Sequence, residues 1–243
     1  MSASLSQTEF DALTALRTFL IGILPTGIEV IRAEINRVPE PPGLNYVVMT
    51  PLTRDRLSTN IETYADVILT GSIAGTTLTV TAINLANLAV GQALFGPGIA
   101  TGSIITALGS GTGGIGTYLI SPAQIISSQQ IYAGTKANLQ PTQVTVQLDV
   151  HGPVSADNAQ IISTLFRDDY ANRVFAESGY AIQPLYTSDA KQLPFINGED
   201  QYEFRWTMDV ILQTNQTVTI PQEFSDQVSV DLVSVEAAYP VGG

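Results

Sequence analysis

The chain has 243 residues, of which 44% are hydrophobic and only 13% are charged, about half the usual charged share. Its net charge of −12 argues against ordinary DNA binding, which requires Lys and Arg to neutralise phosphates. The lack of cysteine excludes disulfides and thiolate chemistry. No signal peptide or membrane-length apolar run is evident, so we expect a protein that folds where it is made. So little charge also suggests that part of the surface is covered by neighbouring proteins.

The first predicted element is a helix that begins near Ser6. Ser6 and Glu9 fit a capping box, and Leu5 and Phe10 occupy the positions of a hydrophobic staple. Pro25 ends the helix. Until then apolar residues recur at helical spacing, which predicts one buried face, made of Phe10, Leu13, Leu16, Leu20 and Leu24.

Two strands are predicted next, over residues 29–33 and 46–50. The second is apolar enough to be buried on both faces. A proline-rich connection at 38–42 lies between them, and its prolines cannot donate to a strand ladder. The segment 54–64 is polar and mixed, and no element is predicted there.

The composition changes at about residue 67. Residues 67–135 contain no charged side chain and hold 12 of the 20 glycines. Short β-prone runs at 78–81, 103–106 and 117–120 alternate with glycine-rich turns. We interpret 67–135 as a small all-β domain inserted into a core domain formed by residues 1–66 and 136–243.

The core domain resumes with a strand in which Val144, Val146, Leu148 and Val150 alternate with polar residues. A second helix is predicted from Ser155 or Asp157 to just before Gly179. One face of that helix carries Ile162, Leu165, Phe166 and Tyr170.

Two closing strands are predicted, through residues 202–212 and 228–235. A phase slip in the second predicts a bulge or burial on both faces. Two main helices with long strands indicate an α+β core domain with a mixed or antiparallel sheet.

Residues that might carry chemistry are sparse. His151 is the only histidine and precedes Gly152-Pro153, so we interpret it as a turn residue and not as a catalytic base. Zinc sites need several Cys or His ligands, and the acidic pairs 168–169 and 199–200 lack calcium-loop spacing. Residues 109–114 match GxGxxG, but a β-prone run follows them in place of the required helix. We predict no enzyme activity, catalytic residue, metal site or cofactor.

Three aromatic residues share one face of the predicted strand at 202–212, namely Tyr202, Phe204 and Trp206. They could form a stacking platform for bases or sugars. Because Met208 and Val210 lie on the same face, and same-face apolar residues are normally buried together, we predict that the aromatic residues belong to the core.

Four short motifs carry a family resemblance. They are NRVPEP (36–41) and VVMTPL (47–52) in the N-terminal part, and YEFRW (202–206) and IPQEF (220–224) in the C-terminal part. The second motif is accompanied by Arg54, Arg56, Leu57, Thr59 and Asn60. Residues 1–66 and 136–240 thereby resemble the phage neck terminator family. Separately, GTGGIGTY (111–118) is similar to a β-module that recurs as an insertion in phage virion proteins.

This resemblance implies a virion structural protein, assembled in the host cytoplasm, at the junction between head and tail. It implies a homo-oligomeric ring, commonly a hexamer, with neck or connector proteins on the head side and tail tube or sheath proteins on the tail side. Genomic DNA would pass through the lumen without specific binding, past acidic side chains that do not attract phosphate. No membrane contact is implied.

A ring requires two different contact surfaces on each subunit. The proline-rich arm is one candidate, because an extended segment loses little entropy on binding. Sheet edges are another. The residues expected to contact a neighbouring subunit are Val38, Pro39, Glu40, Pro41, Pro42, Pro221 and Phe224.

Other functions remain open at this point. The chain could be a baseplate or tail-completion protein, or a carbohydrate-binding module for host attachment, although residues 67–135 contain only three aromatic residues, Phe95, Tyr118 and Tyr132. A phage hydrolase would need a pair of carboxylates in a pocket. The segment 67–135 either packs against another virion protein or is a passive decoration.

Overall fold

The computed structural model describes residues 3–33, 43–84, 87–193, 195–196 and 202–224. The chain divides into two compact units. The core unit comprises Met1–Tyr64 and Lys136–Ile220, and the glycine-rich unit comprises Ala65–Thr135 and Pro221–Gly243. Residues 221–224 thus belong with the glycine-rich segment, whereas the sequence had placed them in the core domain.

Three helices and ten strands of one mixed sheet make up most of the described chain, which confirms the α+β class. The helices are α1 (Glu9–Ile23), α2 (Ser155–Leu165) and α3 (Asp169–Glu177). The strands are β1 (Ser4–Leu5), β2 (Glu29–Arg32), β3 (Tyr46–Arg56), β4 (Ile61–Asn84), β5 (Ala93–Phe95), β6 (Ile104–Leu108), β7 (Gly116–His151), β8 (Ile182–Thr187), β9 (Lys191–Gln192) and β12 (Arg205–Pro221). A separate pair is formed by β10 (Phe195–Ile196) and β11 (Tyr202–Glu203).

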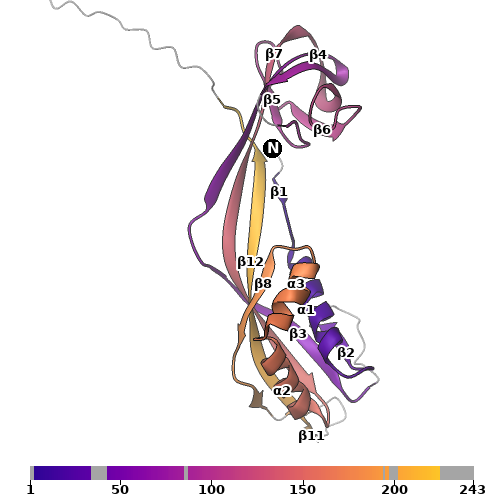
Figure 1. The fold of residues 1–243 in the computed structure, drawn as a ribbon, viewed down its shortest axis with the longest axis vertical. Helices are drawn as coiled ribbons and strands as arrows, with labels where there is room; N and C mark the ends of the chain where they lie inside the picture. Colours follow the sequence, from indigo (N-terminus) through magenta and orange to yellow (C-terminus); the bar gives the residue numbers. More distant parts are fainter. Residues whose placement is uncertain (1–2, 34–42, 85–86, 194, 197–201, 225–243) are drawn as a thin grey trace, which may run out of the picture. The chain divides into compact units, whose positions relative to one another are not determined.

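The main path of the sheet runs β1-β12-β7-β3-β2. Strands β2 and β3 pair in parallel, and β7 is antiparallel to β3. The three helices cover one face of this sheet in the core unit (Figure 1). Val144, Val146, Leu148 and Val150 of β7 all point into this core and are buried, as their alternation predicts.

Helix α1 begins two residues later than predicted. Thr8 and Asp11 form the capping box, in place of Ser6 and Glu9. With this start, Leu13, Leu16, Phe19 and Leu20 face the core, whereas Phe10 is 61% exposed and contacts the Arg32 guanidinium, 4.8 Å from its ring centroid. The prediction that Phe10 is part of the buried face was therefore wrong.

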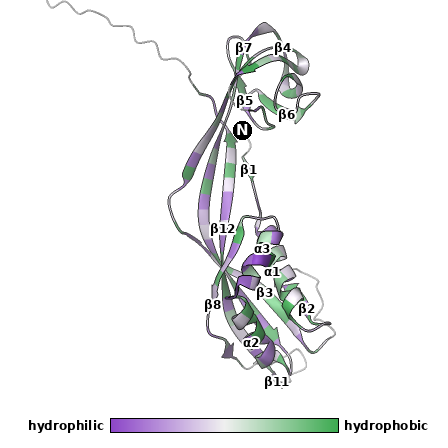
Figure 2. Cartoon of the chain, viewed as in Figure 1, coloured by the Kyte–Doolittle hydropathy of each residue, from purple (hydrophilic) through white to green (hydrophobic). Residues whose placement is uncertain are grey.

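The predicted second helix is two helices, α2 and α3. The helical conformation is interrupted at residues 166–168. There the Asp168 side chain caps α3 by accepting a hydrogen bond from the Tyr170 N–H. The first residue of α2 is Ser155, but no side chain caps that helix. Figure 2 shows α3 as largely hydrophilic, in keeping with its two buried residues, Ala171 and Phe175.

The break between α2 and α3 builds an aromatic cluster around Phe19. Phe166 packs edge-on against the Phe19 ring at 5.6 Å between centroids, and Phe175 lies 5.8 Å from it. Because all three rings are at most 1% exposed, they join the helices to one another as well as to the sheet.

The glycine-rich unit has its own core, with Leu78, Leu94 and Tyr118 among its buried residues. The β-prone runs at 78–81, 103–106 and 117–120 lie largely in β4, β6 and β7. The GxGxxG segment is a turn between β6 and β7, as its context predicted. It folds over the Tyr118 ring, whose hydroxyl accepts from the Gly113 N–H at 3.0 Å and donates to the Gly114 carbonyl at 2.6 Å.

Two of the three aromatic residues near the start of β12 correct another prediction, whereas Trp206 is partly buried and packs against the core as predicted. Tyr202 is 82% exposed and Phe204 is 59% exposed, whereas Met208 and Val210 are buried. The reason is a break at Phe204 between β11 and β12, so the alternation that places Met208 in the core does not extend back to Tyr202. The strand predicted at 228–235 lies outside the described residues.

The aromatic cluster predicts the effect of two matched substitutions in α1. Phe19→Ala removes a fully buried ring and should lower the free energy of unfolding by about 3–5 kcal/mol. Phe10→Ala, on the exposed face of the same helix, should change it by less than about 1 kcal/mol. Urea unfolding followed by Trp206 fluorescence measures both, and equal effects would contradict the assignment of Phe19 to the core.

The Tyr118 turn predicts a second matched pair. A Cβ at Gly111 would lie 2.5 Å from the Tyr118 ring, whereas one at Gly114 would meet nothing within 4 Å. Gly111→Ala should therefore destabilise the glycine-rich unit by about 1–3 kcal/mol, and Gly114→Ala should be close to neutral. Hydrogen exchange at the amides of β6 reports this unit selectively; slower or unchanged exchange in Gly111→Ala would refute the packing.

Candidate assembly interface

The two edges of the core unit's sheet differ in how fully they are paired. On one side, β12 is followed along its length by β9, β8 and β1. The intervals between these strands are bridged, because Asn215 donates its N–H to the Ala181 carbonyl and Ser6 donates to the Thr217 carbonyl. This edge of β12 is therefore covered by the chain itself.

The opposite edge is covered only at its beginning. Strand β2 pairs with Tyr46–Met49, and the Ala33 N–H donates to the Met49 carbonyl. From residue 50 onward, within the described ranges, β7 is the only other strand that pairs with β3 and β4. Residues 50–64 thus present the outer side of β3 and of the start of β4, and we call this segment the open edge.

A β-bulge sets the side-chain directions along the open edge. The register of β3 against β7 shifts between Pro51 and Thr53, which leaves Leu52 as the extra residue. After the bulge, Arg54 lies opposite the buried Val144, so its side chain points to the face that the helices cover. Without the bulge, Arg54 would point to the other face.

Four large apolar side chains are exposed on the open edge. Leu52, Leu57, Ile61 and Tyr64 have exposed fractions of 48%, 46%, 56% and 56%. A single exposed leucine is unremarkable, but four within thirteen consecutive residues on an unpaired edge form a surface suited to contact with another protein.

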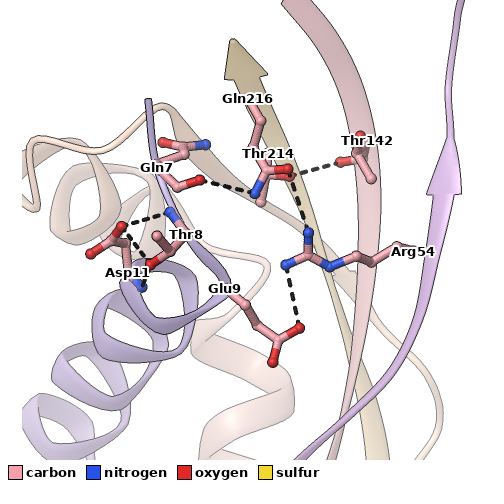
Figure 3. A network of polar contacts seen from close by, with 8 residues as sticks. All are labelled: Gln7, Thr8, Glu9, Asp11, Arg54, Thr142, Thr214 and Gln216. Atoms are coloured by element: carbon pink, nitrogen blue, oxygen red, sulfur yellow. Dashed lines mark hydrogen bonds and ion pairs between the residues drawn. The ribbon is translucent and has the colours of Figure 1, made fainter. Parts of the chain in front are cut away.

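Polar contacts hold the first part of the open edge against α1 and β12 (Figure 3). The Arg54 guanidinium lies 3.3 Å from a Glu9 carboxylate oxygen and donates to the Gln216 side chain at 3.4 Å. Gln216 in turn donates to the Gln7 carbonyl at 3.3 Å. A cavity of about 370 Å³ lies beside these groups, lined by Glu9, Pro51, Leu52, Thr53, Arg54 and Val144.

The second part of the open edge carries a different set of charges. Arg56 donates to the side chains of Asn60 and Gln140, and within the described part of the chain no carboxylate pairs with it. Glu62 pairs with Lys136 at 2.7 Å. The hydrogen bond from Lys136, with a smaller one from Tyr64, lowers the pKa of Glu62, and the same bond raises the pKa of Lys136.

Hydrogen bonds of Gln7 and Thr8 hold the N-terminal segment at the covered edge. Gln7 is buried and makes two hydrogen bonds with the Ala181 backbone, one as donor and one as acceptor. Thr8 donates its backbone N–H at 2.7 Å and its hydroxyl at 2.8 Å to the Asp11 carboxylate (Figure 3). These bonds, the backbone bond first, lower the pKa of Asp11.

The residues that the sequence predicted as inter-subunit contacts are distributed unevenly. Val38, Pro39, Glu40, Pro41 and Pro42 lie outside the described residues. Pro221 is buried at the end of β12. Phe224 is half-buried in the glycine-rich unit, where it packs edge-on against Phe95 at 5.1 Å and Tyr132 at 5.7 Å. Its role as a contact between subunits stays a prediction.

The open edge was not among the predicted contacts. Its polar segment 54–64 gave no periodic signal, because a bulge and a turn interrupt the alternation. Leu52, Leu57 and Ile61 lie five and four residues apart, which does not match the period of two that marks a strand.

His151 has a structural environment. It is 5% exposed, its ring stacks on Tyr46 with 4.4 Å between centroids, and its Nδ1 lies 3.4 Å from the Glu203 carboxylate.

Within the described ranges, no three His, Asp or Glu side chains are grouped so that they could hold a metal ion. No described helix is long and apolar enough to cross a membrane.

The pKa of Asp11 predicts a pH-dependent contribution to stability. Because the folded-state pKa is lowered, this contribution is present above the unfolded-state pKa of about 4 and is lost as the pH falls through the folded-state value. Asp11→Asn should therefore be less stable than the parent at pH 7, with a difference that shrinks at pH 3. Urea unfolding at both pH values tests this, and Thr8→Ser, which keeps the hydroxyl, should retain the parent's pH dependence.

Comparison with known proteins identifies one matching family. The sequence model of the phage neck terminator protein family matches residues 111–237, just over half of the chain. This range includes the motifs at 202–206 and 220–224, whereas those at 36–41 and 47–52 lie outside it. The match runs through residues 111–118 into the core unit, so it gives no support to a separate inserted module. No curated protein is significantly similar to the chain.

The neck terminator family is a family of structural proteins of the virion, and its members assemble with other neck and tail proteins. An exposed sheet edge with apolar side chains agrees with such a role. On this evidence, the chain belongs to the phage neck terminator protein family.

Proposed function

We propose that the protein forms a homo-oligomeric ring of about six copies at the head–tail junction. The ring joins the tail tube or sheath to the neck or connector proteins, and genomic DNA passes through its lumen. The observation that carries this proposal is the asymmetry of the core sheet, which has one covered edge and one open edge. A ring needs heterologous contacts, in which two different surfaces of one subunit meet its two neighbours.

The low charge of the chain supports extensive burial in an assembly. Only 13% of the residues are charged, and residues 67–135 have no charged side chain. Surfaces of this kind lose little solvation energy when a neighbouring protein covers them. A contact role for the glycine-rich unit against another virion protein is part of this proposal.

Passage of DNA fits the excess of acidic residues. The 22 Asp and Glu residues outnumber the 10 Lys and Arg residues, so a lumen lined by carboxylates would repel phosphate. We propose that such residues face the lumen. A ring structure with a basic lumen would contradict this part of the proposal.

The alternative functions gain less support. In the glycine-rich unit, Tyr118 is buried, and Phe95 and Tyr132 stack on each other while Phe224 packs edge-on against both, so these rings do not form a flat sugar-binding surface. Tyr202 and Phe204 are exposed beside a cavity of about 190 Å³, and carbohydrate binding there is the second candidate. A baseplate or tail-completion position would use the same open edge and differs only in its neighbours.

The ring proposal predicts the mass of the purified protein. Six copies of the 25.9-kDa chain give about 155 kDa. Native mass spectrometry should show a single closed oligomer near this mass, and negative-stain electron microscopy should show rings with a central opening. A protein that stays monomeric at tens of micromolar would contradict self-assembly, and an open-ended series of masses would contradict a closed ring.

A further inference from the structure

The open edge is long enough to require a partner. Residues 50–56 of β3 extend over about 23 Å and residues 61–64 of β4 over about 13 Å, with a bend at 57–60 between them. Within the described ranges, the outward backbone groups of both segments pair with no other strand. Long unpaired edges with apolar side chains associate readily with other strands. One edge of the sheet is covered by the chain itself, whereas Leu52, Leu57 and Ile61 remain exposed on the other. The open edge is therefore a suitable site for the addition of a β-strand.

One strand predicted from the sequence, at residues 228–235, lies outside the described residues. Residues 228–235 read VSVDLVSV, with apolar side chains on both faces of the predicted strand. The family match extends to residue 237, so this segment belongs to the part of the chain that defines the family. Eight extended residues span about 26 Å, which is close to the length of the β3 part of the open edge, residues 50–56.

Residues 50–64 carry two arginines and two carboxylates and so have no net charge, but Arg56 offers a local partner for an acidic strand. Residues 225–243 contain three acidic residues, Asp226, Asp231 and Glu236, and no Lys or Arg. On the open edge, Arg56 has only amide partners among the described residues, although the chain as a whole carries a large negative charge. An acidic strand placed beside Arg56 would give its guanidinium a carboxylate partner.

We propose that the open edge binds residues 228–235 of a second copy of this chain as an added β-strand. This inference rests on the proposed homo-oligomer and identifies its interface. Each copy donates one strand and accepts one, so the contact is heterologous and repeats until the ring closes. The exposed Leu52, Leu57 and Ile61 become covered by the valine and leucine side chains of the donated strand.

The absence of cysteine allows a direct cross-linking test. One variant carries Thr53→Cys, Asp55→Cys or Leu57→Cys on the open edge, and a second carries Ser229→Cys or Ser234→Cys in the donated strand. After the two are co-assembled and oxidised, at least one combination should give a disulfide-linked pair of chains on a non-reducing gel. Gln183→Cys, exposed on β8, replaces the edge variant in the control and should give no such pair.

Two further variants test the energetics in the full chain. Arg56→Glu should raise the concentration needed for assembly by about tenfold or more, because it places like charges side by side. Asp231→Arg in the same chain should restore assembly. The thermal unfolding temperature of the dilute monomer should be the same in all three proteins, which separates an interface effect from misfolding.

The outcomes distinguish this inference from the ring itself. Rings that form normally but give no cross-link at any of the edge positions would overturn the strand addition and leave the ring intact. A double variant that carries an edge cysteine and Ser229→Cys or Ser234→Cys in the same chain tests the intramolecular alternative. A disulfide that forms in this variant only within single chains would show that each copy covers its own edge, and would also overturn the inference. A protein that never assembles would remove the ring and the inference together.

Discussion

The structure depends on the need of long β-strands to satisfy their backbone hydrogen bonds on both sides. Strand β7 is the centre of this network, since it pairs with β3, β4, β5, β6 and β12. In the core unit, residues 142–151 pair with β3, and in the glycine-rich unit the same strand pairs with β5 and β6. Its neighbour β12 is covered in turn by β9, β8 and β1, whereas β3 is covered only as far as Met49. The open edge is what remains when this pairing is complete.

The hydrophobic core of the core unit lies on one face of the sheet. Helices α1, α2 and α3 cover a single face of the sheet, and Phe19 joins all three through contacts with Phe166 and Phe175. The N-terminal segment is anchored to the covered edge by Gln7, while Arg54 connects the open edge to α1 through Glu9. The open edge therefore belongs to a well-supported sheet, which favours a defined interface over non-specific association.

Strong periodicity was enough to predict the main elements of the fold. The alternation at Val144–Val150 and the helical spacing from Leu13 to Leu24 both correspond to buried faces. Prediction failed where local chemistry competed with periodicity. Thr8 and Asp11, and not Ser6 and Glu9, form the capping box of α1. Asp168 caps α3 and so divides one predicted helix into two. The break at Phe204 exposed Tyr202, and no periodic pattern could reveal the open edge, because an edge is defined by which strands do not pair.

If copies of this neck terminator protein meet at the open edge, its backbone amides become hydrogen-bonded on assembly. Hydrogen–deuterium exchange of the assembled protein and of the dilute monomer reports these hydrogen bonds. We expect amides in residues 50–64 to exchange markedly more slowly in the assembly, while those of β8 exchange at similar rates in both states. Equal exchange of residues 50–64 in the two states would contradict it.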